Sequence, residues 1–387
     1  TSMQKRIFYS SVILISFGIM MVYSLSTYTV LIYDARGDHF ISKQCISALV
    51  AIILMWWVSQ INIDRYFKVF KNALAILPFL LILAIPFLPE SLATNAGGAQ
   101  RWIRLFGFSI APLEFFKIGF IMFLSDNLSR NYQRHASFRE ELGSLLPILV
   151  AMILGFLCVV WSQNDFGQVV VMCGSFCVML LFAGGSKKLL GSFVALAFFG
   201  FAIIIGWATR RVERLKIWWA SVQNFVIDKI PFLSYLRVED MPEPYQIYHA
   251  GNAIHHGGWV GNGIGAGVVK LGFLSEVHTD MVLAGVAEEF GFLGIIVVLG
   301  LFLFGVIYPI LKIANRVQNQ MYSLYCIGVA CLLSFAFFIN ALGVTGVIPI
   351  KGIAVPFLSY GGSSLVCVGL ALGIVLAISK KIAPPTS

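Results

Sequence analysis

The chain has 387 residues, of which 59% are hydrophobic and only 12% are charged, and its formal net charge is +9. A soluble domain usually carries about a quarter charged residues, so the composition excludes an ordinary soluble protein. The apolar residues come in repeated runs of about 20, the length that a helix needs to cross a bilayer. No stretch alternates apolar and polar residues as a transmembrane β-barrel does. The composition therefore predicts an all-α polytopic membrane protein.

The apolar runs predict about ten transmembrane helices within a single membrane domain that covers residues 1–387. In chain order, the expected spans are 7–30, 41–59, 72–89, 112–128, 143–161, 167–184, 188–208, 281–311, 321–346 and 361–379. The first run follows Lys5 and Arg6 and is too long for the apolar core of a signal peptide. We therefore interpret it as a retained helix.

The charges of the short loops predict the orientation of these spans. Alternate loops are basic and contain Lys5, Arg6, Arg65, Lys68, Lys71, Arg130, Arg134, Arg139, Lys187, Lys188, Lys312, Arg316, Lys380 and Lys381. The opposite short loops contain only Arg36, Lys43, Arg101, Arg104 and Lys351. The positive-inside rule places the basic set in the cytoplasm. With an even number of spans, both termini are expected there too.

Residues 209–280 form one large extracytoplasmic loop between the seventh and eighth expected spans. Connections of about seventy residues are uncommon and are usually functional or disordered. Aromatic residues recur every few positions in this loop, which favours amphipathic helices lying at the membrane interface over disorder. The loop ends with "GFLSEVHTD", so Asp280 is expected at the outer membrane–water boundary, where the chain re-enters the bilayer.

Asp280 is the candidate catalytic residue. A carboxylate at the mouth of a span is partly desolvated, and such a setting suits a general base. His278 and Thr279 precede it and are candidates for substrate contact. The alternative is structural, because Thr279 or Asp280 could simply cap the helix that follows.

The motif "AEEFG" places Glu288 and Glu289 inside the eighth span. Carboxylates within a membrane are costly and usually functional, so at least one of them is expected to face a polar cavity. On a continuous helix Glu288 lies about 80° around the axis from Asp280, whereas Glu289 points to the opposite side. Glu288 is therefore the better candidate for substrate contact.

A second candidate stretch is "GGAQRWIRLFGFSIAPLEFFK" at residues 97–117. Pro112 suits the first turn of a helix, and Glu114 and Lys117 are close enough to form an ion pair. This pair either contacts substrate or only fixes its helix. Arg101 and Arg104 lie just outside the span, where they either meet an anionic head group or anchor the chain at the interface.

The stretch "IPIKGIAVPFLSYGGSS" at residues 348–364 predicts an irregular outward segment before the last span. Its exposed N–H groups, Lys351 and the serines Ser359, Ser363 and Ser364 could line an anion site. In "WSQNDFGQ", Asp165 occupies a tight outward turn and is expected to be structural.

The sequence contains no convincing site for a bound metal or organic cofactor. The cysteines lie inside apolar segments, and we interpret the Cys173–Cys177 pair as packing residues. His249, His255, His256 and His278 match no zinc spacing. Loose binding of Mg²⁺ or Mn²⁺ by Asp280, with phosphates completing the shell, is the remaining metal hypothesis.

Taken together, these motifs resemble the SEDS family (shape, elongation, division and sporulation proteins) over essentially the whole chain. The motifs are "GGAQRWIRL", "PLEFFK", "NDFGQ", "PYQ", "GNGIGAGVVKLGFLSEVHTD", "AEEFG" and "PFLSYGGSSL". The lysine in "IPIKGIAVPF" makes the chain more similar to the FtsW type, the division branch, than to the RodA type, the elongation branch.

The resemblance implies a peptidoglycan glycosyltransferase that polymerises lipid II at the outer face of the bacterial cytoplasmic membrane. It places the essential aspartate of the family on Asp280 and adds Gln246, from "PYQ", to the substrate-binding candidates. It also implies a class B penicillin-binding protein, a transpeptidase, and other divisome proteins as partners, and no nucleic acid. The chain departs from many members at Ser275-Glu276 and at Met281, and it lacks an Asn-Pro-Trp pattern after Arg214.

A lipid II flippase or similar transporter is the alternative function. Transporters favour internal repeats and charged residues near the middle of the membrane. No clear internal repeat is present, but Glu114, Lys117, Glu288 and Glu289 keep this alternative open.

Overall fold

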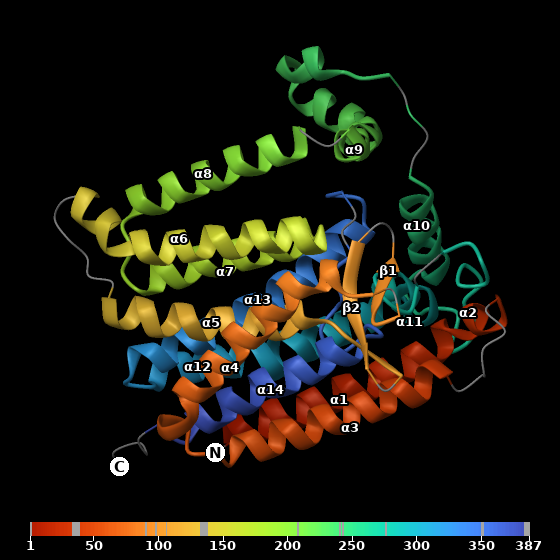
Figure 1. The fold of residues 1–387 in the computed structure, drawn as a ribbon. Coiled ribbons are helices and arrows are strands. Elements are labelled where there is room, and N and C mark those ends of the chain that lie inside the picture. The colour runs from red at the N-terminus through yellow and green to blue at the C-terminus, as the bar shows by residue number, and fades with distance from the viewer. Residues whose placement is uncertain are drawn as a thin grey trace.

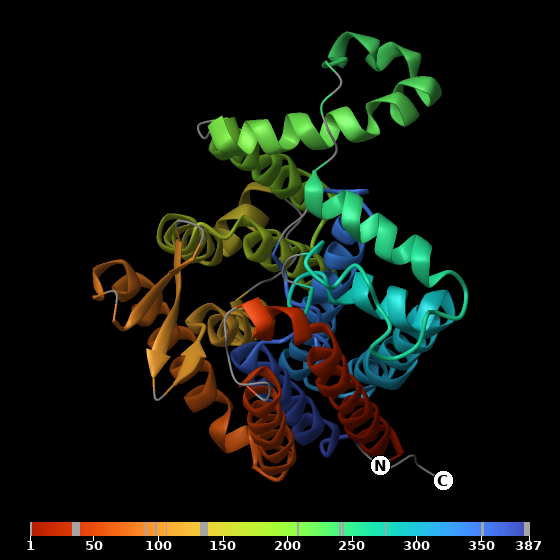
Figure 2. The ribbon, with the colours of Figure 1, turned by 90° about the vertical axis from the view of Figure 1, so that its right-hand side faces the viewer.

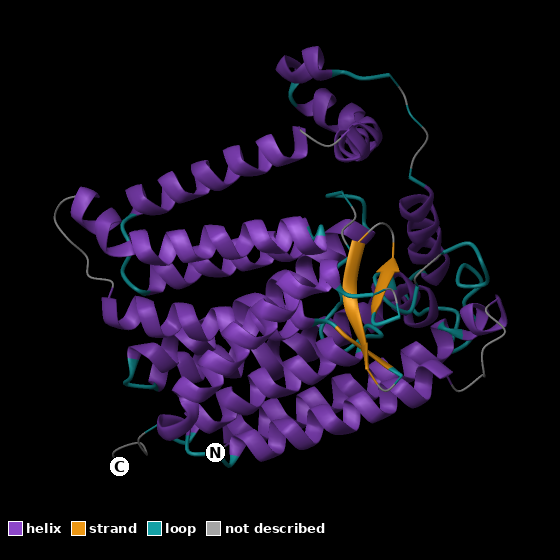
Figure 3. Ribbon diagram, in the orientation of Figure 1, coloured by secondary structure: helices purple, strands orange, loops and turns teal. Residues whose placement is uncertain are grey.

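The structure is a computed structural model in which a bundle of long helices carries its irregular segments at one end (Figure 1). It describes residues 2–32, 39–89, 91–96, 99–105, 107–131, 138–206, 209–239, 241, 244–274, 277–349 and 352–382. Both termini lie together at the opposite end of the bundle (Figure 1). We call the end with the strands and most of the loops the loop end (Figure 3).

A long helix occupies every range in which an apolar run predicted a span. These helices are α1 (Ser2–Leu25), α3 (His39–Ser59), α4 (Ile63–Ala84), α5 (Pro112–Asn131), α6 (Phe138–Gln163), α7 (Phe166–Phe182), α8 (Lys187–Gly206), α11 (Val282–Gly300), α13 (Gln320–Val344) and α14 (Gly362–Ser379). A π-helical turn, η3 (Leu301–Ile307), continues α11 into α12 (Tyr308–Arg316). In the described ranges, 7 helical stretches are long and apolar enough to cross a membrane, and α7 is a shorter apolar helix. The chain is a polytopic helical membrane protein.

Helix α14 lies in the core of the bundle, and nearly all of its side chains are buried. It packs along α3, and the main apolar core also includes side chains from α1, α5, α11 and α13. Helix α8 lies at the edge and presents large apolar side chains outward, such as Phe198 and Phe199. Outward-facing apolar residues of this kind suit a helix that is surrounded by lipid.

A small antiparallel sheet at the loop end corrects the expectation of an all-α chain. After η1 (Ile85–Phe87), its strands β1 (Ala93–Ala96), β2 (Ala99–Leu105) and β3 (Phe108–Ile110) pair in the order β1-β2-β3. Gly107, with φ of 81°, makes the turn between β2 and β3. Ile103 and Ala93 pack on Ile85 in a separate small core. Strands this short carry too few alternating residues for the pattern to stand out in the sequence.

The long connection between α8 and α11 is largely helical, as expected. It contains α9 (Thr209–Lys229), η2 (Pro231–Leu236) and α10 (Tyr245–Gly257). Helices α9 and α10 run across the direction of the bundle helices at the loop end (Figures 1 and 2). The indole of Trp218 on α9 donates a hydrogen bond to Gly346 O, just beyond α13, at 3.0 Å. Their position at a membrane interface stays a prediction.

Helix α11 is interrupted at Gly291, and residues 258–263 are inserted into the break. Phe292 N and Leu293 N donate to Gly258 O and Trp259 O, at 2.9 and 3.1 Å, instead of to carbonyls one turn earlier. The carbonyls of Glu288 and Glu289, which the break releases, accept from Asn262 N and Gly263 N. The break therefore leaves these backbone groups paired, as a segment inside a membrane requires.

Replacing Gly291 with alanine is expected to destabilise the protein. Gly291 has φ of 66° and ψ of −170°, a conformation that is essentially restricted to glycine and costs other residues about 1–3 kcal/mol. An added Cβ would also stand 2.4 Å from Gly261 N. Thermal unfolding in detergent measures the effect, with Gly300→Ala as the control, because Gly300 has open space around it. Equal unfolding temperatures for the two variants would contradict the prediction.

Candidate active site

The segment that carries Asp280 is held by three successive backbone carbonyls. His278 O accepts from Tyr360 N at 2.8 Å, and Thr279 O accepts from the Ser359 hydroxyl at 2.7 Å. Asp280 O accepts from the side-chain amide of Asn340 on α13, also at 2.7 Å. The backbone of residues 278–280 is therefore fixed immediately before α11 begins.

The carboxyl group of Asp280 lies against Gly352. A Cβ added at Gly352 would stand 2.8 Å from Asp280 Oδ2, so only glycine lets the two approach this closely. The same Asn340 amide donates a second hydrogen bond to Ile353 O at 2.7 Å. Asn340 thus ties the backbone of Asp280 to residues 352–353, and Asp280 itself stays partly exposed.

His278 is buried among aromatic rings. Its ring lies 4.9 Å from that of Phe40 on α3 and 5.7 Å from that of Tyr360, measured between ring centroids. It is only 4% exposed, whereas Thr279 and Asp280 are more open. The structure therefore gives His278 a packing role beside Asp280 and leaves it little surface to offer a substrate.

Residues 352–361 form a tight connection next to Asp280 that polar side chains hold in place. The Ser359 hydroxyl accepts from Val355 N at 2.8 Å while it donates to Thr279 O. Gln44 on α3 brackets the turn by donating to Ser359 O and accepting from Gly361 N. Phe357 has φ of 70°, a conformation that strains a residue other than glycine. These bonds hold a strained turn beside the candidate base.

Glu114 and Lys117 form the expected ion pair, with 2.9 Å between Lys117 Nζ and Glu114 Oε1. The ammonium group also donates to Gln168 Oε1 on α7 at 2.8 Å. The pair lines a pocket with residues from α5, α7, α13, the 352–361 connection and α14. Ala354 and Pro356 belong to this lining, so one short connection borders both the pocket and Asp280.

Arg101 is engaged within the protein, which favours an anchoring role, and its binding of an anionic head group stays a prediction. Its guanidinium donates to Gln163 O and Asn164 O at the end of α6, at 2.9 and 3.2 Å. It also lies 3.5 Å from the carboxylate of Asp165. Basic side chains at a helix C-terminus stabilise its unpaired carbonyls, and this is the role that Arg101 takes. Arg104 is exposed.

Asp165 is a helix cap, in agreement with its expected structural role. Its carboxylate accepts from Gln168 N at the start of α7, at 3.3 Å. Burial raises the pKa of Asp165, and the charge of Arg101 opposes this rise. The Arg101–Asp165 pair thus joins the sheet to the turn between α6 and α7.

Glu288 and Glu289 do not face a polar cavity, so that expectation is wrong. Both are 1% exposed. The carboxylate of Glu288 accepts from Val268 N and Val269 N, at 2.7 and 3.0 Å. Glu289 pairs with Lys270 at 2.7 Å. The loop folds back onto α11 and uses both carboxylates, which leaves Glu288 no surface for a substrate.

The structure says less about the remaining candidate residues. Gln246 lies partly buried in the first turn of α10. Lys351 lies outside the described residues. Among the residues that are described, no three His, Cys, Asp or Glu side chains gather as metal ligands.

Gln44, Gln168 and Asn340 also organise the site, although none of them was a candidate residue from sequence. Gln44 and Asn340 are almost fully buried, at 1% and 3% exposed, and each joins two backbone groups. Polar side chains within apolar spans are costly unless they are paired, so a glutamine or asparagine inside such a span could have been recognised from sequence as a candidate.

Exchanging Asn340 for aspartate is expected to slow the reaction that Asp280 supports by about tenfold or more. The two side chains have the same shape, but a carboxylate cannot donate to Asp280 O and Ile353 O. A small displacement of a catalytic group can cost on the order of 100-fold in rate. Turnover of this variant, compared with Asn319→Asp at the other end of α13, measures the effect. Asn319 caps that helix, and aspartate caps equally well. Equal turnover in both variants would contradict the positioning role.

Comparison with known proteins decides the family. A family model described as "Cell cycle protein", which groups FtsW, RodA and SpoVE, matches residues 4–383. The chain belongs to the FtsW–RodA–SpoVE family. This confirms the resemblance to SEDS proteins that the sequence motifs indicated.

Curated relatives match this family member over nearly its full length. A Helicobacter pylori (strain ATCC 700392 / 26695) protein named "Probable peptidoglycan glycosyltransferase FtsW" is 46% identical over 381 residues, 97% of this chain and 98% of that protein. A protein of the same name from Trichlorobacter lovleyi is 33% identical and covers 97% of this chain and 93% of the relative. "Stage V sporulation protein E" of Bacillus subtilis (strain 168) is 30% identical over 376 residues, 96% of this chain and 95% of that protein.

Solved structures share the fold of this family member. The rod shape determining protein RodA of Thermus thermophilus matches with a TM-score of 0.65 at 20% identity, over 98% of this chain and 97% of that one. A chain from a peptidoglycan synthase complex, described as coordinating polymerization and crosslinking, matches with a TM-score of 0.71 at 22% identity. That match covers 96% of this chain and 97% of the other.

Proposed function

We propose that this member of the family is a peptidoglycan glycosyltransferase that polymerises lipid II during cell division, with Asp280 as the general base. The observation that carries the proposal is the fixed position of Asp280. Its backbone is tied to α13 and its carboxyl group borders Gly352, yet it remains partly exposed at the start of α11. Relatives that match the whole chain carry the name of this activity.

The reaction requires a base at a lipid–water boundary. The 4-hydroxyl of one lipid II attacks the anomeric carbon of another, a new glycosidic bond forms, and undecaprenyl pyrophosphate leaves. Asp280 accepts the hydroxyl proton as the oxygen attacks, which is the ordinary work of a general base. Because the substrate is an amphiphile, this base must meet the sugar where the lipid head group lies, and the loop end of the bundle suits this position.

The leaving pyrophosphate needs positive charge. Arg101 is engaged at the end of α6, so Lys351, the neighbour in sequence of Gly352, becomes the main protein candidate. We include Mg²⁺ or Mn²⁺ as a further candidate. Magnesium is often held by one or two carboxylates together with substrate phosphates, and Asp280 could supply one carboxylate in this way. Such a metal would arrive with the substrate phosphates and supply charge to the leaving group.

The proposed topology has ten spans, with both termini in the cytoplasm and the loop end outside the bacterial cytoplasmic membrane. Both termini lie at one end of the bundle, which supports an even number of crossings (Figure 1). The basic short loops support the assignment of that end to the cytoplasm. Residues 209–280 then form the large extracytoplasmic loop.

The proposed partner is a class B penicillin-binding protein, a transpeptidase that crosslinks the new strand, together with other divisome proteins. The structural neighbour from a peptidoglycan synthase complex supports a partnership of polymerisation with crosslinking. A polymerase that assembles with a crosslinking enzyme would pass its product on without release.

A lipid II transporter is the second candidate, and the broken helix α11 is the observation in its favour. Transporters use interrupted helices near the middle of the membrane to bind their substrates. In this chain, however, residues 258–263 fill the break and pair its freed backbone groups. The break is therefore better explained as an anchor for the loop than as a substrate site.

Lipid II in detergent micelles distinguishes the two functions, because micelles contain no bilayer to cross. The purified protein, with and without the transpeptidase and Mg²⁺, is expected to yield glycan polymer in at least one of these conditions. Failure in all of them, together with lipid II translocation in liposomes that depends on Glu114, would favour the transporter.

A further inference from the structure

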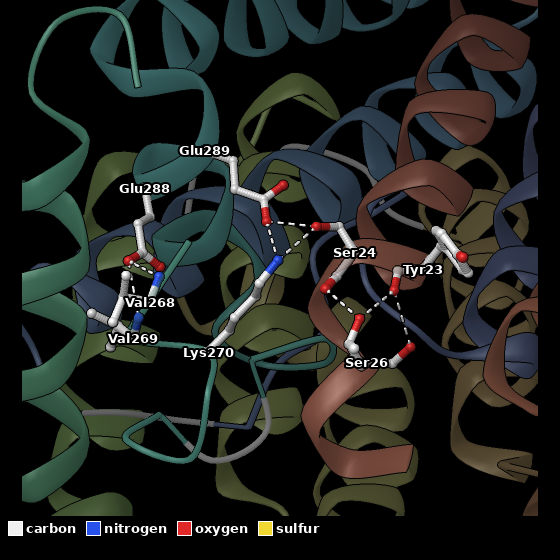
Figure 4. Close-up of polar contacts among 9 residues, drawn as sticks. Tyr23, Ser24, Ser26, Val268, Val269, Lys270, Glu288 and Glu289 are labelled. Atoms are coloured by element: carbon white, nitrogen blue, oxygen red, sulfur yellow. Dashed lines mark hydrogen bonds and ion pairs between the residues drawn. The ribbon is translucent and has the colours of Figure 1, made fainter. Parts of the chain in front are cut away.

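A buried charge network joins three distant parts of the chain near the break in α11 (Figure 4). The ammonium group of Lys270 lies 2.7 Å from Glu289 Oε1 on α11 and 3.0 Å from the Ser24 hydroxyl on α1. The Ser24 hydroxyl in turn donates to the same Glu289 oxygen at 2.5 Å. The side chains of Lys270 and Glu289 are 4% and 0% exposed. Lys270 is thus enclosed between α1 and α11.

The residues just before Lys270 are held by the same helix. Glu288 accepts from Val268 N and Val269 N (Figure 4). The break at Gly291 binds residues 258–263. We call residues 258–270 the anchored segment. Its last residue, Lys270, precedes Asp280 by only ten positions.

The Lys270 network is therefore a second place, besides the contacts of residues 278–280, at which the chain near Asp280 is fixed. Residues 271–274 follow Lys270 directly, and the carbonyls of residues 278–280, shortly after them in sequence, bind Asn340, Ser359 and Tyr360. The short sequence distance between Lys270 and Asp280 lets a shift of Lys270 relative to α11 reach the residues that carry the carboxyl group. Because Ser24 belongs to α1, the same network also fixes the loop against the first helix.

Stability alone does not account for such a pair. Burying two charges costs desolvation, and replacing a buried ion pair with apolar side chains of similar volume is often neutral or stabilising. What a buried pair can supply is a single defined register between the elements that it joins. In this chain those elements are α1, α11 and the segment that leads to Asp280.

We propose that Lys270 is a positioning residue, which acts through its pair with Glu289 and Ser24 to hold residues 278–280 in the arrangement that catalysis needs. The proposal rests on the proposed function of Asp280. Lys270 touches no reacting atom in this role. Its effect should therefore fall on kcat and on the order of residues 278–280, and not on KM.

The test compares Lys270→Met with the double variant Lys270→Met/Glu289→Met and with Lys216→Met, an exposed lysine of α9. The single variant strands the Glu289 carboxylate and is expected to unfold at a lower temperature. The double variant removes both charges at similar volume, so its unfolding temperature should return close to that of the wild type. Lys216→Met should match the wild type throughout.

Two measurements on the double variant decide the proposal. Its kcat for lipid II polymerisation is expected to fall on the order of 10- to 100-fold, with KM changed less than twofold. Amide hydrogen exchange in peptides covering residues 271–281 is expected to speed up at least tenfold, while α13 keeps its protection.

The outcomes separate this proposal from the proposed function. Unchanged exchange in residues 271–281 of the double variant would overturn the positioning role, whatever its turnover. Faster exchange with wild-type kcat would overturn it as well, because the order of the segment would then be irrelevant to catalysis. A wild-type protein that makes no polymer under any condition would instead refute the proposed function, and the exchange experiment would still report whether Lys270 holds the segment.

Discussion

Asp280→Asn is expected to fold and insert normally but to polymerise lipid II about 10²–10⁴-fold more slowly than the wild type, the usual loss when a general base is removed. The amide has the same shape as the carboxylate but cannot accept the hydroxyl proton. The backbone bonds of Asp280, through its carbonyl to Asn340, are unaffected by the exchange. Its unfolding temperature should therefore stay close to that of the wild type. Glycan chain formation from labelled lipid II measures the loss.

The control for this variant is Asp228→Asn. Asp228 is an exposed aspartate on α9, in the same large loop, and removing its charge changes the net charge equally. It should polymerise at the wild-type rate. Similar losses in both variants would point to a general effect of loop charge and would count against Asp280 as the base.

Lys117→Met is expected to lower the stability of the protein clearly. Removing one partner of a fully buried ion pair costs about 3–5 kcal/mol, because the other charge is left without compensation. The Lys117 and Glu114 side chains are 12% and 16% exposed, so water reduces the cost below that range. Gln168 also loses the ammonium group that it accepts from. Thermal unfolding in detergent measures the change.

Two further variants show whether the stranded charge is the cause. Lys117→Met/Glu114→Gln leaves no unpaired charge and should recover most of the lost stability. Lys188→Met, at the exposed start of α8, should unfold as the wild type does. If the double variant is as unstable as Lys117→Met, loss of the hydrogen bond to Gln168 would explain the effect better than the ion pair.

The helices of the bundle could be predicted from sequence because a membrane imposes a simple rule on them. Each apolar run of about 20 residues must satisfy its own backbone, so it becomes a helix. The sheet at residues 93–110 follows no such rule, since strands of three to seven residues leave a weak pattern. The break at Gly291 could not be predicted from the local sequence either, because the residues that fill it come from a different part of the chain.

The candidate site was predictable only in part. A carboxylate at the mouth of a span is unusual enough in sequence to single out Asp280, and Glu114 and Lys117 have the spacing of a helical pair. Whether a charged side chain is available to a substrate depends on its neighbours in three dimensions. From sequence, the side chains of Arg101 and Glu288 were candidates for binding a substrate. In the structure, both bind backbone groups of other segments of the chain.

The central claim, that the carboxylate of Asp280 accepts the proton during polymerisation, is tested most directly by chemical rescue. Asp280→Ala is assayed with lipid II in detergent micelles, with and without formate, beside the wild type. We expect almost no polymer from Asp280→Ala alone, partial recovery when formate supplies the missing carboxylate, and no gain for the wild type. Polymer formed by Asp280→Ala at the wild-type rate without formate would contradict the role of Asp280 as the base.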